Sequence, residues 1–590
     1  MTRRHVPHAA IALLLLVALA PWPAPAAGQT DAPAPEHRHP DQSPPRFNFL
    51  TPENREAAAH LAVQDFRGRM KPLDTRAREV CMKISKREHF EGWEPIDLYF
   101  SWLTRPEFWF NYPLIAVRFP GVKQLLGVSP DTKWVSAASL ITPDNRYVLE
   151  DKVREALRTP DRDRSKLQRK LLKFDERFNI LYDVLNGGGL RLYPLPGDPN
   201  HKWLEFADVQ HLPDDAYGKQ AKAALRTLLA GLRAEDNLRI RDGLQQTAAL
   251  QQQYDPTVLP SAAALKAELW LNRHHPFRNV TVPYFVAFLL LLIAYFWSVF
   301  ARDNAPYRWR QPLFGLGMLV MLGATLFHLY AFVLRWIASG RAPLSNGYES
   351  LIFIALATAI AGLLFEVKDR RGAAGSVAAM LTFLILAVAM LSTFDPAIGP
   401  LVPVLASYWL NIHVTVITAS YGFLGVSSLL GGLMLVLYLF KGPGRRHVHD
   451  AIVKLDRLQY DVLVVGLGLL SVGTLLGGVW ANESWGRYWG WDPKETWSLV
   501  TILVYAAVVH LKWIPALRGS WVQAATGTLA FASVLMTYFG VNYFLTGLHS
   551  YGAGETPTFI KWLYISGVLV ALLTLASYAA HRTRRWDRAA

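Results

Sequence analysis

The sequence predicts an all-α polytopic membrane protein, with about nine transmembrane helices that follow a cleavable signal and a mostly helical periplasmic domain. Three observations predict this fold class. Of the 590 residues, 52% are hydrophobic and only 18% are charged; long apolar segments fill the C-terminal half; and basic residues alternate between its loops. A chain this long and this apolar is neither an ordinary soluble protein nor one compact domain.

The cysteine count and the net charge exclude several other classes. Cys81 is the single cysteine, so the chain closes no internal disulfide and has no Cys-x-x-Cys pair for zinc or thiol exchange. The formal charge of +15 would suit nucleic acid, but a membrane protein also collects Lys and Arg in its cytoplasmic loops. The positions of the charges must therefore decide between these two interpretations.

The first 45 residues have the composition of an export signal and a leader. In residues 1–27, Arg3 and Arg4 precede an apolar run, Ala9–Ala20, that is too short to span hydrocarbon comfortably. Small residues after this run suit a processing site. Residues 28–45 are rich in Pro, Ala and charge, which predicts a flexible leader.

Residues 46–280 have the composition of a soluble, mostly helical domain. Apolar residues recur at helical spacing in 167–186 and 221–254, which predicts helices there. The stretch 63–75 is dense in turn formers and cations, and we expect a basic turn that packs on the rest of the domain. The domain shows no catalytic constellation.

Residues 281–590 form the predicted transmembrane domain. Most of its apolar segments reach the ~20 residues that a helix needs to cross a bilayer. The nine segments are 281–300, 313–334, 350–365, 375–394, 413–440, 461–480, 498–514, 521–545 and 559–580. Segment 350–365 is short, so its neighbours must extend it or the protein must bury it.

The loops between these segments alternate in charge. The connections near 301–312, 366–374, 441–460, 512–520 and 581–590 carry 17 Lys and Arg, whereas the opposite set holds only five. By the positive-inside rule the first set is cytoplasmic, so the soluble domain and the second set lie outside. The predicted signal requires the same sidedness. The excess of Lys and Arg is therefore explained by the orientation of the chain in the membrane, and we expect no nucleic acid partner.

The outer loop between the sixth and seventh spans is rich in tryptophan. Five tryptophans lie within Trp480–Trp497, on a segment punctuated by Gly and Pro and containing acids. The interfacial aromatic belt explains one or two of them. Rigid indoles form a low-entropy platform for a large planar apolar ligand, and glycines let the backbone approach its face. A porphyrin is such a ligand.

An iron porphyrin also needs axial ligands, and neutral imidazole is the usual one. Outside the signal and the soluble domain the histidines are His328, His413, His447, His449, His510, His549 and His581. His413 and His549 are predicted to be external and flank the tryptophan-rich loop in sequence. Each alone is more typical of a hydrogen-bonded boundary histidine, but beside the tryptophans the two favour a bis-histidine haem site.

Several motifs resemble one known family. The pattern Trp485-Gly-x-x-Trp489-x-Trp491-Asp492-x-x-Glu495 resembles the tryptophan-rich (WWD) signature of the haem-handling proteins of cytochrome c maturation, and the flanking sequence resembles the CcsA (ResC) branch. The other matches are Pro343-x-Ser345-Asn346-x-Tyr348-Glu349-Ser350, Ser407-x-Trp409-Leu410-x-x-His413-Val414 and Gly547-Leu548-His549-Ser550-Tyr551. The resemblance covers roughly residues 310–580. The stretch 64–75 is similar to a segment of longer members that carry an extra periplasmic domain.

The resemblance implies the haem-handling subunit of a system II cytochrome c synthase, or haem lyase, in a bacterial inner membrane with its C-terminus in the cytoplasm. Haem b would move outward to the WWD site, where His413 and His549 would ligate its iron and Trp485, Trp489 and Trp491 would support its ring. Apocytochrome c would then bring a Cys-x-x-Cys-His segment for thioether attachment. His510 would ligate haem in transit, and a ResB/CcsB-type membrane partner would supply the opposing histidine, because this chain shows no clear ResB portion.

Three further site residues have open roles. Arg487 binds a haem propionate or pairs with the neighbouring acids, and so does Lys494. Asp492 fixes the loop or orients an imidazole through its ring N–H, and we count it with His413 and His549 among the catalytic candidates. Two other functions stay open: a haem exporter or chaperone that forms no thioether bond, and a structural respiratory membrane subunit.

Overall fold

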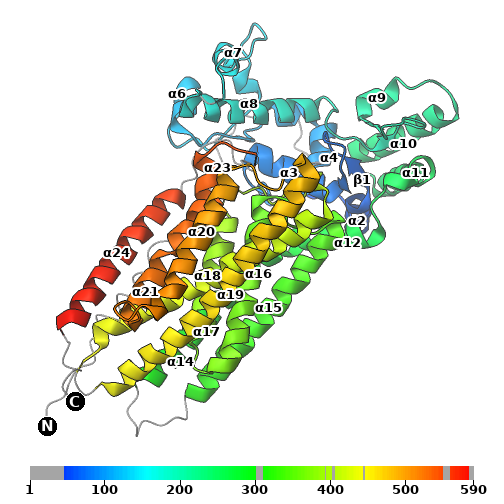
Figure 1. Ribbon diagram of the computed structural model, residues 1–590. Coiled ribbons are helices and arrows are strands. Elements are labelled where there is room, and N and C mark those ends of the chain that lie inside the picture. The colour runs from blue at the N-terminus through cyan, green and yellow to red at the C-terminus, as the bar shows by residue number, and fades with distance from the viewer. Residues whose placement is uncertain are drawn as a thin grey trace.

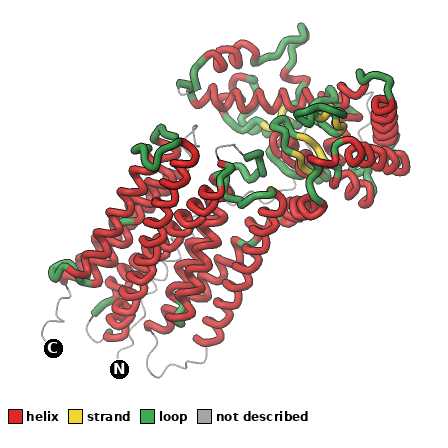
Figure 2. The backbone as a smooth tube through the Cα atoms, turned by 45° about the vertical axis from the view of Figure 1, so that its right-hand side comes forward, coloured by secondary structure: helices red, strands yellow, loops and turns green. Residues whose placement is uncertain are grey.

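The computed structural model describes residues 46–583 except 162, 301–309, 392–393, 402–404, 443–444 and 549–558. The predicted signal and leader, and His549, lie outside the described residues. Within them the predicted fold class is confirmed: the elements are almost all helices, and eight helices are long and apolar enough to cross a membrane. The few short strands all belong to the N-terminal part (Figure 2).

The N-terminal part is built around one hydrophobic core, which runs from Phe49 to Leu269 and buries Trp102 and Tyr193 completely. Its helices are α2 Pro52–His60, α3 Leu73–Ser85, α4 Pro95–Thr104, α5 Pro106–Asn111, α6 Pro120–Leu125, α7 Glu150–Arg158, α8 Lys166–Leu185, α9 Phe206–Gln210, α10 Ala216–Ala234, α11 Asn237–Tyr254, α12 Ala262–His274 and α13 Pro276–Asn279, with 3₁₀ turns at Ala138–Leu140 and Pro256–Val258. Three antiparallel pairs complete it: β1 Ala62–Gln64 with β2 Met70–Pro72, β3 Ile115–Ala116 with β4 Trp134–Val135, and β5 Tyr193–Pro194 with β6 Trp203–Leu204.

The two helical stretches predicted in this part correspond to three helices in the structure. The prediction at 167–186 is confirmed by α8, which starts with a capping box at Ser165. The prediction at 221–254 is confirmed by two helices, α10 and α11. Glu235 ends α10 in the left-handed conformation (φ +54°), and the side chain of Asp236 caps α11.

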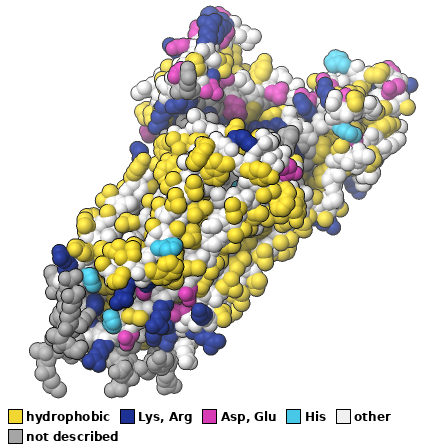
Figure 3. All heavy atoms as spheres, viewed as in Figure 1, with side chains coloured by type: hydrophobic (Ala, Val, Ile, Leu, Met, Phe, Trp, Pro, Cys, Tyr) yellow, Lys and Arg dark blue, Asp and Glu magenta, His cyan; other side chains and the backbone are white. Residues whose placement is uncertain are grey.

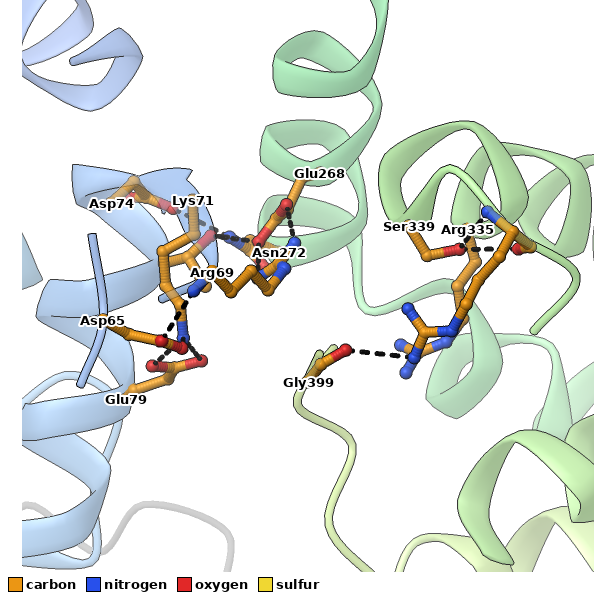
Figure 4. Close-up of polar contacts among 12 residues, drawn as sticks. Asp65, Arg69, Lys71, Asp74, Glu79, Glu268, Asn272, Arg335, Ser339 and Gly399 are labelled. Carbon is orange, nitrogen blue, oxygen red and sulfur yellow. Dashed lines mark hydrogen bonds and ion pairs between the residues drawn. The ribbon is translucent and has the colours of Figure 1, made fainter. Parts of the chain in front are cut away.

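The stretch 63–75 forms the β1–β2 hairpin and the start of α3. The Asp65 carboxylate accepts the backbone N–H groups of Arg67 (2.8 Å) and Arg69 (3.0 Å) across the turn, and the Lys71 ammonium lies 3.0 Å from it. The Arg69 guanidinium donates to both oxygens of Glu268 in α12 (Figure 4). The predicted basic turn packed on its own domain is confirmed.

The C-terminal part is a bundle of long helices, and the N-terminal part lies against one end of it (Figure 1). We call this the domain end and the opposite one the far end. The helices are α14 Thr281–Phe300, α15 Arg310–Ser339, α16 Gly347–Asp369, α17 Ala373–Ala389, α18 Tyr408–Phe440, α19 Arg446–Trp485, α20 Pro493–His510, α21 Ser520–Leu529, α22 Phe531–Leu535, α23 Val541–Phe544 and α24 Phe559–Thr583.

Several helix boundaries differ from those of the predicted spans. The short segment 350–365 is extended to Gly347–Asp369 by an Asn346 cap at one end and a left-handed Arg370 at the other. α17 has only 17 residues and is shorter than the eight candidate spans. The eighth span is divided into α21, α22 and α23, with a 3₁₀ turn at Leu511–Trp513 before it and a π turn at Met536–Gly540 within it.

Small residues bring α18 and α19 close together. A Cβ atom on Gly473 would lie 2.9 Å from the Ile417 backbone, and one on Gly466 would lie 2.7 Å from the Leu424 side chain. Glycine removes the side chain that would separate two membrane helices, so their backbones pack in direct contact. Figure 3 shows apolar side chains covering the flank of this bundle, with Lys and Arg gathered at the far end.

Candidate functional site

The tryptophan-rich loop joins α19 to α20 at the domain end. Gly486 ends α19 with φ +70°, and Trp491 also has a left-handed backbone, with φ +59°. Asp492 then caps α20: its Oδ2 accepts the N–H of Lys494 (3.0 Å), while Glu495 Oε2 accepts the N–H of Asp492 (3.2 Å). This reciprocal capping box fixes the direction in which the loop enters the helix.

Asp492 also binds the segment that precedes His549. Its Oδ1 accepts the backbone N–H of Leu548 at 2.7 Å. Gly547 makes this approach possible, since a Cβ there would lie 2.4 Å from the same oxygen. Of the two predicted roles for Asp492, the first has direct support: one carboxylate holds the α20 terminus and the backbone next to His549 together.

His413 lies on the second turn of α18 and faces α19. Its Nδ1 is 2.7 Å from the carbonyl oxygen of Gly473. A carbonyl only accepts hydrogen bonds, so Nδ1 carries the proton and Nε2 carries the lone pair, the form in which imidazole ligates a metal. The ring stacks parallel to Trp480, with 6.3 Å between ring centroids and 7° between planes.

Two contacts fix this position of His413. A Cβ on Gly477 would lie only 2.6 Å from its Cε1, so this glycine provides the space for the imidazole. Ser407, directly before α18, donates a hydrogen bond to Glu483 near the end of α19. The motif Ser407-x-Trp409-Leu410-x-x-His413 therefore works by fastening α18 to α19.

In the described part of the chain, four of the tryptophans within Trp480–Trp497 pair edge to face, two by two. Trp480 is buried and contacts Trp485 at 4.8 Å between ring centroids, and Trp489 contacts Trp491 at 5.8 Å. Trp491 is 70% exposed. The first pair lies beside His413, and the second presents indole surface outward at the domain end.

Further exposed apolar side chains come from the elements around this loop. They are Tyr408 and Trp409 at the start of α18, Tyr488 in the loop itself, Phe544 at the end of α23 and Leu548 after it. Exposed aromatic surface with glycines between its members suits a large planar ligand. The described residues contain no group of three or more His, Cys, Asp or Glu placed to hold a metal ion.

The two cations of the loop have different partners. Arg487 lies 3.8 Å from Glu495 and 5.8 Å from the ring of Trp485, and its guanidinium occupies the place where a Cβ of Gly490 would be. Lys494 donates to Asn542 Oδ1 at 3.1 Å. Among the described contacts, the predicted pairing with a loop acid thus applies to Arg487, and Lys494 instead joins α20 to α23.

His510 is the last residue of α20, at the far end and exposed. α20 begins five residues earlier than predicted, so His510 lies about 26 Å from the start of the helix at ~1.5 Å per residue. Its Nδ1 is 2.7 Å from the carbonyl of Ala506, which leaves the lone pair on Nε2. His510 and His413 therefore belong to opposite ends of the bundle.

His328 is completely buried and separate from both. Its Nδ1 lies 3.4 Å from the hydroxyl of Tyr284, and its ring contacts Phe277 edge to face. It approaches the backbone of Ile352 across the α15–α16 interface. These contacts describe a packed histidine between α14, α15 and α16.

Comparison with known proteins places these residues in a family. The family model described as "Cytochrome C assembly protein" matches residues 344–549, which include the tryptophan-rich loop, His413 and His510. The CcsA protein of a Synechococcus strain is 38% identical over 47% of this chain and 98% of its own length. The chain belongs to the cytochrome c assembly protein family. The CcsA protein of Chlamydomonas reinhardtii is 39% identical, over 40% of this chain and 67% of its own.

A longer relative of this family covers the N-terminal part as well. Protein NrfI of Wolinella succinogenes is 35% identical over 90% of this chain, and the matched region spans 58% of NrfI. In the present chain, Glu349 of the motif at 343–350 is completely buried. It accepts hydrogen bonds from Arg335 (2.8 Å) and from the Ser345 hydroxyl (2.8 Å), so this motif joins α15 to α16.

Sequence reasoning missed Asn542, Gly473 and Gly477. Asn542 carried no separate signal, because its role depends on a neighbour 48 positions away in the chain. Gly473 and Gly477 are four residues apart, a spacing that is typical of close helix packing. This spacing does not predict that the Gly473 carbonyl accepts a hydrogen bond from the His413 imidazole.

Proposed function

We propose that this member of the cytochrome c assembly family binds haem b at the domain end and presents it for attachment to apocytochrome c. His413 and His549 would be the axial ligands. The observation that carries the proposal is the state of His413, which the Gly473 carbonyl holds with its Nε2 lone pair beside Trp480. Asp492 supports the second ligand, because it holds Leu548, the residue before His549.

The domain end would face the outside of a bacterial inner membrane, with residues 46–280 as a periplasmic domain and the C-terminus in the cytoplasm. The gathering of Lys and Arg at the far end supports this orientation (Figure 3). Haem would be the substrate at this face, with its ring against the Trp489–Trp491 pair and a propionate near Arg487. Guanidinium groups pair well with carboxylates.

Attachment itself is an addition reaction. Each cysteine thiol of the Cys-x-x-Cys-His segment adds across one vinyl group of haem, so that the sulfur bonds to one vinyl carbon and the hydrogen ends on the other. No electron is gained or lost. Ligation of the iron on both faces would leave the porphyrin edge accessible, and the chain would contribute orientation and exclusion of oxidants.

His510 would ligate haem during its passage from the cytoplasmic side. It lies exposed at the far end, on a helix whose outward surface has few contacts with the rest of the bundle. An ionisable group on such a surface is a candidate for function. A ResB/CcsB-type membrane partner would cover this surface and supply the opposing ligand.

The absorption spectrum of the purified protein tests the ligands. We expect haem absorbance in the wild type and its loss in His413→Ala and His549→Ala, with partial recovery on adding imidazole. His449→Ala is the matched control, because His449 is exposed in the basic far-end segment. Unchanged absorbance in both ligand variants would favour a structural respiratory subunit.

Co-expression with an apocytochrome c separates attachment from transport. Covalent haem on the cytochrome that depends on His413 supports the proposal, since thioether bonds survive denaturation. Haem that is bound and released without covalent product would instead indicate an exporter or chaperone. Deletion of residues 46–280 tests whether that domain binds the partner or the apocytochrome; full maturation without it would exclude this role.

A further inference from the structure

A pocket of about 390 Å³ lies where the N-terminal part meets the domain end of the bundle. Three segments distant in sequence form it: the β1–β2 turn, the chain after α15 and the chain after α17. Its lining residues are Arg67, Gly68, Arg69, Ser339, Gly340, Arg341, Gly399, Pro400 and Leu401. Figure 4 shows the hairpin residues and the α15 residues on two sides of this space, with Gly399 between them. The volume falls in the ~300–1,000 Å³ range of small-molecule sites.

The cations around this pocket differ in their partners. Arg69 pairs with both oxygens of Glu268, and Lys71 is shared between Asp65 and Glu79. Arg67 and Arg341 form no ion pair with any carboxylate in the described part of the chain. Two guanidinium groups, one from each part of the molecule, therefore line the pocket without an ion pair of their own in the described part of the chain.

Local contacts hold the Arg341 guanidinium at the pocket, and the Arg67 guanidinium lies near the same loop. Arg341 Nη2 donates to Ser345 Oγ (2.9 Å) and to the Gly399 carbonyl (3.0 Å), while its Nε is buried and has no hydrogen-bond partner among the described residues. Burial outweighs the attraction of Glu349 and lowers the pKa of Arg341. A Cβ on Gly399 would lie 4.0 Å from Arg67 Nη1, which places Arg67 at the same loop.

The chemistry of the lining selects an oxyanion. Guanidinium groups bind phosphate through paired N–H donors, and two of them can share the several oxygens of one phosphate group. Ser339 is the last residue of a candidate span, so the pocket lies at the level of the lipid headgroups. Pro400 and Leu401 add an apolar side that suits the organic part of such a ligand.

We propose that this pocket binds a phosphate group, carried by an anionic phospholipid headgroup or by a free phosphate compound. The anion joins Arg67 of the N-terminal part to Arg341 of the bundle, and so fastens the domain to the membrane part. The inference is independent of haem binding and is tested without measuring cytochrome maturation.

The test uses the full chain purified in detergent and in nanodiscs. Wild type, Arg67→Gln and Arg67→Gln/Arg341→Gln are compared with Arg278→Gln, a control in which an exposed arginine at the same end of the bundle is removed. Inorganic phosphate is titrated by isothermal calorimetry. Retained lipid is measured by native mass spectrometry after transfer from phosphatidylglycerol or phosphatidylcholine nanodiscs. The ligand-free melting temperature shows whether each variant is folded.

We expect the wild type and Arg278→Gln to bind inorganic phosphate or to retain phosphatidylglycerol in preference to phosphatidylcholine. Affinity or retention should fall at least tenfold in the double variant and severalfold in Arg67→Gln, whose exposed side chain can be lost without unfolding. Phosphate binding without lipid preference assigns a free phosphate compound; phosphatidylglycerol retention assigns a lipid. Binding that is absent in the wild type, or equal in all four proteins, overturns the proposal.

Discussion

At the scale of single residues, a backbone carbonyl one helix away decides what His413 can do. The hydrogen bond to Gly473 selects the tautomer with its lone pair on Nε2 and fixes the ring plane against Trp480. A second backbone contact, from Leu548 to Asp492, positions the segment before His549. The positions of both proposed ligands thus depend on hydrogen bonds between a backbone group of one segment and a side chain of another.

Replacing Asp492 tests whether its shape or its charge matters. Asp492→Ala removes the α20 cap and the acceptor for Leu548, which should cost about 0.5–2 kcal/mol of stability and most of the haem absorbance. Asp492→Asn keeps an acceptor oxygen and is an equally good cap, so we expect near wild-type haem content. Thermal unfolding and haem absorbance are measured for both variants to decide between shape and charge. An Asn variant as damaged as the Ala variant would show that the negative charge is required.

Cys81 should be inert in the folded protein. It is completely buried, and burial raises the pKa of its thiol to about 12, so only about one thiol in 10⁵ is the reactive thiolate at pH 7. Ellman's reagent should label no thiol in native protein and one per chain after denaturation in SDS. Fast labelling of the native protein would contradict this, and would mean that α3 opens readily.

The sequence predicted the site residues in unequal measure. Trp485, Trp489, Trp491 and Asp492 share one short loop, so their proximity could be read directly. The closeness of His413 to this loop rests on contacts across 60 and more positions, which no local pattern encodes. The edge-to-face arrangement of the indoles is likewise a packing result that residue types do not determine.

At the scale of elements, the α18–α19 contact is what brings His413 to the site. Gly477→Ala places a methyl group 2.6 Å from His413 Cε1 and should displace the imidazole, lowering haem absorbance severalfold. Gly468→Ala is the matched control on the same helix, because nothing lies within 4 Å of its Cβ position. Both changes raise helix propensity by ~1 kcal/mol. Equal haem content in the two variants would show that His413 tolerates the shift.

The membrane spans could be predicted because a run of about twenty apolar residues is typical of a helix that crosses a bilayer. The points at which one helix ends and the next begins could not be predicted. α10 and α11 are separated by Glu235, a residue with no special preference for the left-handed conformation. The strands are two or three residues long and depend on tertiary contacts, such as the Gln64 side chain that accepts the N–H of Trp203.

At the scale of the whole molecule, α12 and its left-handed terminal residue His275 carry the N-terminal part onto the bundle. Trp270 of α12 contacts Tyr330 of α15 at 5.2 Å, and His275 Nε2 lies 3.1 Å from Glu88. Glu88 also pairs with Arg78 of α3. The junction between the two parts therefore contains a carboxylate held by Arg78 and His275.

This junction makes the domain sensitive to acid. Burial alone raises the pKa of Glu88, but His275 and Arg78 outweigh it and lower the pKa from 4.5 to about 2. Because the folded state favours the ionised carboxylate, the stabilisation is complete above pH 4.5 and is lost as the pH falls toward 2. Wild type should therefore unfold at a higher temperature than Glu88→Gln at pH 6, and the difference should shrink between pH 4.5 and 2. A difference that stays constant over this range would show that Glu88 contributes through packing and not through its charge.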